Sequence, residues 1–494
     1  MTSSVDQAPA NAAEPQSFGG RARSGTIWIL AGFGLGQLLR LGANVALAAI
    51  LFEEVFALMA IVTAVMMGLA MFSDIGLQAN VVQHPQGGEP DFLNTAWTLQ
   101  VIRGACLFLV ALSLAWPLSL FYGANDPTAY QLLYLIPIAA LTPLIDGFRS
   151  AKLMMAARQL RIKEATKIEF FVGPFNVVVM LVLAWYFRSA YALAVASVLS
   201  SVLFTVLSYR LLDGPASRFH WDKRVVQTIL QFGKWVFLST LFTFLAMQID
   251  RLALARIFTL TEVGVYSIAA SLAVIVPTLA GKLQWSVLFP WYSRMLEEGM
   301  PLPEAFARTR EAMVISSSYL CALLFAGAAS FFELAYDERY AMGGVLLPIL
   351  VCGAWFSCFD TMYGATFVAS GRPKWSAMTN ASKVTAFGLL LALVAFFDLD
   401  IVWAASFLTL SEVLRWMVCQ GLGRRLGLRN TRSELGAFVF FVSVSMAGWW
   451  LVERAPVVSD LSPFWRLFVL GASVTLLFAP LFVKSVAPLV KRRG

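Results

Sequence analysis

Residues 54–75 read EVFALMAIVTAVMMGLAMFSDI, a run in which the only charged side chains stand near its two ends. An apolar run of this length matches the helix of about twenty residues that crosses a hydrocarbon layer of about 30 Å. The whole chain repeats the pattern: 59% of its 494 residues are apolar, 13% are charged, and the mean hydropathy is +0.73. Because lipid offers the backbone no hydrogen-bond partners, the sequence predicts an all-α, polytopic membrane protein.

Apolar runs of this kind follow one another along the chain, and their number predicts about 14 transmembrane helices. The runs are residues 26–51, 54–75, 95–121, 130–150, 170–187, 189–212, 229–252, 263–290, 312–335, 343–369, 377–397, 401–421, 435–452 and 464–487.

A weak internal repeat divides these runs into two halves. Trp28 and Glu54 recur as Trp235 and Glu262, with one residue of slip and six runs between the copies. Two halves that face the same way place a cavity at their interface. The predicted segments are a disordered cytoplasmic tail (1–24), an N-terminal six-helix bundle (25–213), a C-terminal six-helix bundle (226–424) and an additional transmembrane helix pair (433–490).

Charge in the loops predicts the orientation of the chain. Lys and Arg gather in alternate loops, such as 149–167 and 424–432, whereas the opposite loops carry mainly Asp and Glu. The positive-inside rule then places both termini in the cytoplasm. The loop 76–94 is the exception, because it should be cytoplasmic but has neither Lys nor Arg. We attribute the net charge of +8 to this asymmetry and to a cationic cavity, and not to nucleic-acid binding.

Three cations stand inside apolar runs, where an ion is costly and marks a pathway or a binding cavity by default. They are Arg40, Arg103 and Lys282. Snorkelling to the headgroups or pairing with a carboxylate is the alternative explanation for each. It fits Arg40 poorly, because Arg40 lies near the middle of its run. We predict these three side chains as cavity cations that bind the substrate.

Two carboxylates, Asp250 and Asp360, are predicted to serve proton or sodium coupling, with a purely structural role as the alternative. Asp250 is followed by Arg251, but adjacent helical residues point in different directions and do not form a simple pair. Asp360 has no evident partner near it in the sequence.

Structural ion pairs are the favoured interpretation of the remaining charges within the runs. Asp146 with Arg149, and Glu412 with Arg415, are spaced i and i+3, so each pair shares a helix face. Lys383 lies close to the end of its run, where snorkelling or pairing with a carboxylate is expected.

The sequence predicts neither catalytic residues nor a metal site. Both histidines, His84 and His220, stand in predicted loops, and the five cysteines lie in apolar runs without the spacing of metal ligands. The loops between runs are too short to hold a catalytic domain, and no carboxylate or histidine cluster appears in them. We therefore expect no enzyme and no cofactor beyond a coupling ion.

Four stretches together resemble the polysaccharide-transporter family, the Wzx-type O-antigen and exopolysaccharide flippases of the multidrug/oligosaccharidyl-lipid/polysaccharide exporter superfamily. The resemblance covers residues from about 25 to 430 and rests on the order and spacing of the stretches. They are SDIGLQ at 73–78 with NTAW at 94–97, Gln100 and Arg103-Gly104; Gln248, Asp250 and Arg251 with EVGVYSIA at 262–269; FPWYSR at 289–294; and SGRPK at 370–374.

The resemblance implies two six-helix bundles in a V with an appended helix pair. It also implies a flippase that moves undecaprenyl-diphosphate-linked oligosaccharide across the bacterial inner membrane by alternating access, in lipopolysaccharide or exopolysaccharide biosynthesis. The expected partners are the lipid-linked oligosaccharide, membrane lipids, and polysaccharide polymerase and chain-length proteins. Cations suit this role, because the planar fork of arginine matches the oxygens of a diphosphate. Trp28, Trp285 and Tyr363 are candidates for stacking on sugar rings, with a lipid-facing or interfacial position as the favoured alternative for most of them.

Other functions remain open at this stage. A lipid II flippase and a multidrug antiporter would share the fold, and the excess of buried cations disfavours an antiporter for cationic drugs. A membrane polysaccharide polymerase would need a large loop or a catalytic cluster, and the sequence shows neither.

Overall fold

The computed structural model describes residues 34, 36–73, 77–159 and 161–491, and within them the secondary structure is helical, without strands. The predicted tail 1–24 and Trp28 lie outside the described residues. In this part of the chain, eleven helices are long and apolar enough to cross a membrane, or twelve if one bent pair is a single span. The all-α membrane fold is thereby confirmed, whereas the count of about 14 is not.

The N-terminal half is built from the helical residues 36–48 and from seven further helices. These are α2 (Glu53–Phe72), α3 (Leu77–Gln83), α4 (Pro90–Gly123), α5 (Leu132–Gly147), α6 (Lys152–Arg158), α7 (Ile162–Phe187) and α8 (Ala190–Arg210).

The C-terminal half follows, with the appended helices after it. These helices are α9 (Lys223–Ile257), α10 (Leu260–Ala273), α11 (Ile275–Leu283), α12 (Phe289–Glu297), α13 (Leu302–Ala326), α14 (Ala328–Ala335), α15 (Ala341–Ala369), α16 (Lys374–Phe396), α17 (Ile401–Arg424), α18 (Thr431–Glu453), α19 (Pro456–Ser459) and α20 (Pro463–Lys491). The helices α13 and α14 form the bent pair, with an angle of 58° between them.

Two of the predicted apolar runs are not among these candidate spans. The run 26–51 begins outside the described residues. The run 229–252 lies inside α9, a helix of 35 residues, and the side chains of residues 230–239 are not among those described.

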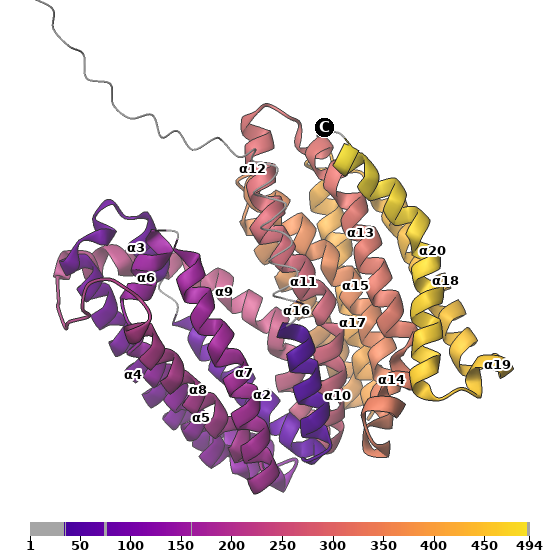
Figure 1. The fold of residues 1–494 in the computed structure, drawn as a ribbon, viewed down its shortest axis with the longest axis horizontal. Coiled ribbons are helices and arrows are strands. Elements are labelled where there is room, and N and C mark those ends of the chain that lie inside the picture. The colour runs from indigo at the N-terminus through magenta and orange to yellow at the C-terminus, as the bar shows by residue number, and fades with distance from the viewer. Residues whose placement is uncertain (1–33, 35, 74–76, 160, 492–494) are drawn as a thin grey trace, which may run out of the picture.

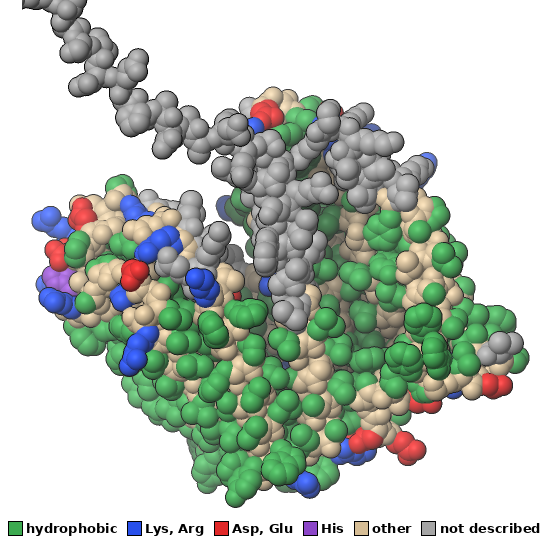
Figure 2. Space-filling model, viewed as in Figure 1, with side chains coloured by type: hydrophobic (Ala, Val, Ile, Leu, Met, Phe, Trp, Pro, Cys, Tyr) green, Lys and Arg blue, Asp and Glu red, His purple; other side chains and the backbone are tan. Residues whose placement is uncertain are grey.

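The two halves meet at one end of the molecule and diverge toward the other, so the ribbon has the outline of a V (Figure 1). The surface is hollowed between them on the side where they diverge (Figure 2). The appended helices α18 and α20 flank the C-terminal half and pack against α13. The face seen in Figure 2 is largely apolar below its upper rim, as expected for a protein that is surrounded by lipid.

The helix α9 belongs to both halves. Near its start, Val226 and Ile229 are buried against Phe92 and Leu93 of α4. Near its end, Leu254 is fully buried in the main core, which includes the C-terminal half. The predicted boundary at residue 226 therefore falls inside a helix that crosses from one half to the other, and the domain limits stay a prediction.

The end where the halves meet, which we call the closed end, is fastened by hydrogen bonds between them. Asn125 donates to the carbonyl oxygen of Phe258 at 2.9 Å, and the amide of Leu260 donates to Oδ2 of Asp126 at 3.1 Å. Arg339 forms an ion pair with Glu53 at 3.3 Å. These contacts join α2 and the α4–α5 connection to the start of α10 and to the segment before α15.

A glycine allows the helices to approach closely at the closed end. A Cβ atom at Gly264 of α10 would stand 2.0 Å from the carbonyl oxygen of Glu53. Only a residue without a side chain allows α10 and the start of α2 to touch in this way.

Candidate functional site

Arg40 lies in the helix 36–48, and its side chain is exposed. Among the residues that the structure describes, it forms no hydrogen bond and no ion pair. It lies near enough to Arg251 of α9 for the two positive charges to repel each other. Both helices run where the two halves meet (Figure 1).

Arg251 is half-buried and also lacks a hydrogen bond or ion pair within the described part of the chain. Its neighbour Asp250 turns elsewhere and accepts a hydrogen bond of 2.7 Å from the hydroxyl of Tyr266 on α10. Two guanidinium groups near each other with no bound carboxylate form an anion-binding arrangement, because an anion would relieve their repulsion. We call Arg40 and Arg251 the arginine pair.

The sequence did not identify Arg251 as a cavity cation. The sequence indicated Asp250, its neighbour, as a coupling carboxylate. Adjacent residues on a helix point in different directions, so Arg251 has a separate environment. The proximity of Arg40 could not be read from the sequence, because the two residues come from different halves.

Arg103 has local partners that give it a structural role. Its Nε donates to Oγ of Ser73 at 2.9 Å, and its Nη2 donates to the carbonyl oxygen of Ala70 at 2.7 Å. Carbonyl groups at the end of a helix lack partners within the helix, and a cation there is also favoured by the helix dipole. Arg103 thus ties α4 to the end of α2.

Lys282 is exposed on α11, just before the π-helical turn Gln284–Leu288. Such turns interrupt the regular hydrogen bonding of a helix and are frequent at functional sites. The side chain of Gln284 is fully buried, and neither of its polar atoms has a hydrogen-bond partner. The sequence predicted neither the turn nor the buried amide.

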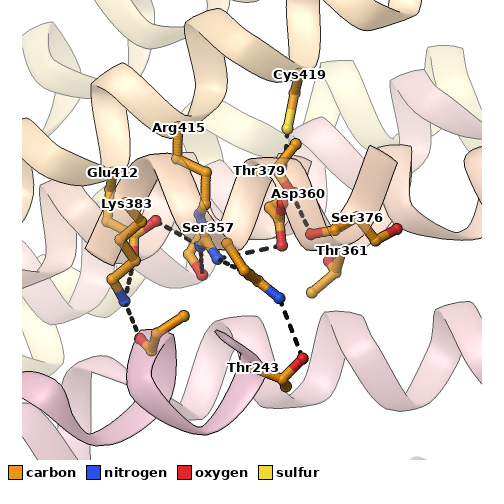
Figure 3. A network of polar contacts seen from close by, with 12 residues as sticks. Thr243, Ser357, Asp360, Thr361, Ser376, Thr379, Lys383, Glu412, Arg415 and Cys419 are labelled. Carbon is orange, nitrogen blue, oxygen red and sulfur yellow. Dashed lines mark hydrogen bonds and ion pairs between the residues drawn. The ribbon is translucent and has the colours of Figure 1, made fainter. Parts of the chain in front are cut away.

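A buried network of charges lies inside the C-terminal half (Figure 3). Glu412 of α17 contacts Nζ of Lys383 at 2.8 Å and Nη2 of Arg415 at 2.5 Å. Arg415 also contacts Oδ2 of Asp360 on α15 at 3.2 Å. The two positive charges of this network are balanced by its two carboxylates, and buried ions need such partners.

Polar side chains complete the network and connect it to α9. Nζ of Lys383 donates to the carbonyl oxygen of Ala246 at 2.6 Å, and Asn380 donates to Oγ1 of Thr243 at 3.3 Å. A change in the charge of the network would therefore alter its contacts with α9, the helix that also carries Arg251.

The predicted structural ion pairs are confirmed by these contacts. Arg149 and Asp146 lie 2.6 Å apart, and Glu412 pairs with both Arg415 and Lys383. Asp360, which has no evident partner near it in the sequence, pairs with Arg415 of α17, the second helix after its own. Its role in ion coupling stays a prediction.

The prediction that Tyr363 is available to stack on sugar rings is wrong. Tyr363 is fully buried and donates a hydrogen bond of 3.0 Å to Glu434. Trp285 is exposed. Within the described ranges, no group of three or more His, Cys, Asp or Glu side chains is placed to hold a metal ion.

Glu434 forms a second buried cluster, which the sequence did not indicate. It is fully buried in the first turn of α18 and accepts hydrogen bonds from Trp416, Gln420 and Tyr363. Arg310 of α13 lies 3.6 Å away. These contacts fix the appended helices to the C-terminal half.

The fold is shared with known transporters. The lipid II flippase MurJ in an inward closed conformation superposes with a TM-score of 0.71 at 9% identity, covering 92% of this chain and 100% of that one. An inward-facing multidrug resistance MATE family transporter of the MOP superfamily superposes with a TM-score of 0.63 at 16% identity, covering 80% of this chain and 96% of that one. A eukaryotic MATE transporter superposes with a TM-score of 0.55 at 14% identity, covering 92% of this chain and 99% of that one.

Sequence comparison gives the family. Among curated proteins, none matches the sequence. The family model described as "polysaccharide biosynthesis protein" matches residues 46–342, which is more than half of the chain. The predicted resemblance to polysaccharide exporters is confirmed by this match, and the chain belongs to this family of polysaccharide biosynthesis proteins.

Proposed function

We propose that the protein is a flippase that carries undecaprenyl-diphosphate-linked oligosaccharide across the bacterial inner membrane for surface polysaccharide biosynthesis. Its family and its MOP-superfamily transporter fold support this proposal. The observation that carries it is the arginine pair: Arg40 and Arg251 lie near enough for their charges to repel each other, and neither forms an ion pair with a carboxylate among the described residues.

The chemistry of the headgroup fits such a pair. A diphosphate carries about two negative charges at neutral pH, and guanidinium groups bind phosphate oxygens through two parallel hydrogen bonds. A charged headgroup could not enter an apolar layer unaided. The hollow between the halves gives it a path, while the polyprenyl tail stays in the lipid (Figure 2).

Alternating access requires that one end opens as the other closes. The hydrogen bonds of Asn125 and Asp126 hold one end closed, and the halves diverge at the other. By the positive-inside rule, the lysine- and arginine-rich loops favour a cytoplasmic location for the diverging end, and cytoplasmic termini are part of the proposal. The conformation then corresponds to a state open toward the substrate's site of synthesis.

Ion coupling belongs to the same proposal. Asp250 is held by Tyr266 on α10, and Asp360 is held by Arg415 in the network of Figure 3. Asp250 belongs to α9, and the network that holds Asp360 contacts α9 through Lys383 and Asn380. Binding of a proton or sodium ion at either carboxylate would therefore act on the helix that carries Arg251. Polysaccharide polymerase and chain-length proteins would receive the flipped product.

The second candidate is a lipid II flippase, favoured by the superposition on MurJ. Lipid II carries the same diphosphate, so the arginine pair suits either substrate. A multidrug antiporter for cations is disfavoured, because two unpaired guanidinium groups repel a cationic drug. A membrane polysaccharide polymerase is the least supported alternative.

Transport in proteoliposomes tests the proposal. The full chain, reconstituted with undecaprenyl-diphosphate-linked oligosaccharide or with lipid II, is assayed for headgroup translocation by enzymatic labelling at one leaflet. Arg40→Ala should lower translocation at least tenfold, because one charge-assisted contact contributes about 1.5–3 kcal/mol. Arg210→Ala is the matched control, since Arg210 is exposed at the end of α8.

Each outcome separates the candidates. Translocation of the oligosaccharide lipid with little lipid II movement supports the first function, and the reverse result supports the second. Equal activity of Arg40→Ala and Arg210→Ala would contradict a role of the arginine pair in either candidate function.

A further inference from the structure

A second cavity lies at the closed end of the C-terminal half, between α14, α15 and α18. Its volume is about 830 Å³, within the range of small-molecule sites. Its walls are mainly apolar, and three carboxylates belong to its lining. The apolar side includes Phe325, Phe332, Val345, Pro348, Met446 and Trp449. The carboxylates are Glu333, Asp337 and Glu338.

The cavity is built into the packing of the helices. The 58° bend between α13 and α14 directs α14 across the start of α15. A Cβ atom at Gly343 would stand 2.2 Å from the ring of Phe332, so α14 can pack this closely only against glycine. Ala329, Ala341 and Gly344 are small residues in the lining and leave the volume open.

Tyr336 lines this cavity and carries a polar atom without a partner. Its side chain is only 9% exposed, and its hydroxyl forms no hydrogen bond. Burial raises the pKa of Tyr336 to about 12, so the hydroxyl is a neutral donor at physiological pH. A buried polar group without a partner costs about 1–3 kcal/mol. The hydroxyl is buried beside the cavity, so an acceptor from outside the chain forms this hydrogen bond when the Tyr336 side chain turns toward it.

The charges of the rim favour a ligand with an ammonium group. Asp337 is paired with Arg339 at 2.5 Å, and Glu333 is paired with Arg466 at 3.0 Å. Glu338 is exposed and, among the described residues, has neither an ion pair nor a hydrogen bond of its side chain. One negative charge is thus left over at the mouth of an apolar cavity.

The apolar wall is open to the surrounding lipid. Val345 is 52% exposed and Met446 is 47% exposed, although both line the cavity. Arg454 lies over the ring of Trp449 at 6.0 Å and adds a positive charge near the same wall. A zwitterionic headgroup would meet both signs of charge here.

We infer that this cavity binds a phospholipid with an ammonium headgroup. One acyl chain fills the space between α14, α15 and α18, an ester carbonyl accepts a hydrogen bond from Tyr336, and the ammonium group contacts Glu338. A polyprenyl diphosphate fits poorly, because its headgroup would meet the unpaired carboxylate. The inference is independent of which lipid-linked substrate the protein transports.

Native mass spectrometry of the full chain tests this lipid site. The protein is released from nanodiscs that contain equal amounts of phosphatidylethanolamine and phosphatidylglycerol with identical acyl chains. Preferential retention of phosphatidylethanolamine, about tenfold, is expected from one charge-assisted contact. Glu338→Gln should remove this preference, whereas Asp460→Asn, another exposed carboxylate, should keep it.

Two further variants separate the hydrogen bond and the cavity from the charge. Tyr336→Phe should lower retention of both lipids about fivefold without loss of thermal stability, because the hydroxyl has no partner within the chain. Tyr134→Phe, at an exposed tyrosine, is its control. Val345→Trp should fill the cavity and displace both lipids.

Three results would overturn the inference. They are equal retention of the two lipids by the unmodified protein, an unchanged preference in Glu338→Gln, and displacement of phosphatidylethanolamine by undecaprenyl diphosphate. The last result would assign the cavity to the tail of the substrate.

Discussion

The arginine pair and the network of Figure 3 use similar residues in opposite ways. In the network, Arg415 and Lys383 are buried and share Glu412 and Asp360, so no charge is left for a ligand. In the arginine pair, the charges of Arg40 and Arg251 repel each other, and no carboxylate of the described residues forms an ion pair with either of them. The comparison teaches that the environment of a cation, and not its presence in an apolar run, decides whether it stabilises the fold or binds an anion.

Removing a carboxylate from the network should have the largest effect. Glu412→Gln leaves Lys383 and Arg415 buried with too little negative charge, and breaking a buried ion pair in this way costs about 3–5 kcal/mol. The measurement is thermal or denaturant unfolding of the purified protein in detergent. Glu298→Gln is the control, because Glu298 pairs with Arg294 at the surface, where such a pair contributes about 0.2–1 kcal/mol. Equal losses in the two variants would contradict the comparison.

The reverse experiment gives the arginine pair a carboxylate. Arg251→Glu places a negative charge near Arg40, so the pair becomes an internal ion pair like those of the network. Translocation should fall at least tenfold, since about 1.4 kcal/mol of lost binding corresponds to that factor. The unfolding midpoint should stay close to that of the unmodified protein. Full activity would show that the hollow does not need two free guanidinium groups, and Arg210→Glu controls for added negative charge.

A smaller effect is expected at the closed end. Asn125→Ala removes the hydrogen bond to the carbonyl oxygen of Phe258, a loss of about 1 kcal/mol or about fivefold in the ratio of closed to open molecules. Spin labels at Ala124 and Met342, both exposed and in different halves, report this ratio as a distance distribution. A distribution unchanged by the substitution would show that this bond does not hold the halves together.

The sequence was sufficient for the features that depend on length and local spacing. Hydropathy identified the eleven or twelve candidate spans of the described residues, although not the predicted count of about 14. The i, i+3 spacing identified Asp146 with Arg149 and Glu412 with Arg415. It was insufficient where partners come from different helices. Asp360 and Arg415 are 55 residues apart in the sequence, and no local sequence pattern predicts a contact between them.

The candidate site was predicted only in part for the same reason. Arg40 was identified because a cation in the middle of an apolar run is costly. Arg251 was not, since its role depends on its proximity to Arg40, a residue far from it in the sequence. Arg103 was predicted as a cavity cation, but its hydrogen bonds to Ala70 and Ser73 involve the end of a neighbouring helix.

Binding of undecaprenyl diphosphate to the protein in nanodiscs tests the central claim most directly. The lipid is titrated against the unmodified chain, the double variant Arg40→Ala/Arg251→Ala and the control Arg210→Ala. Loss of two charge-assisted contacts should raise the dissociation constant of the double variant about a hundredfold or more, with the control unchanged. Equal affinity in all three proteins would contradict the account.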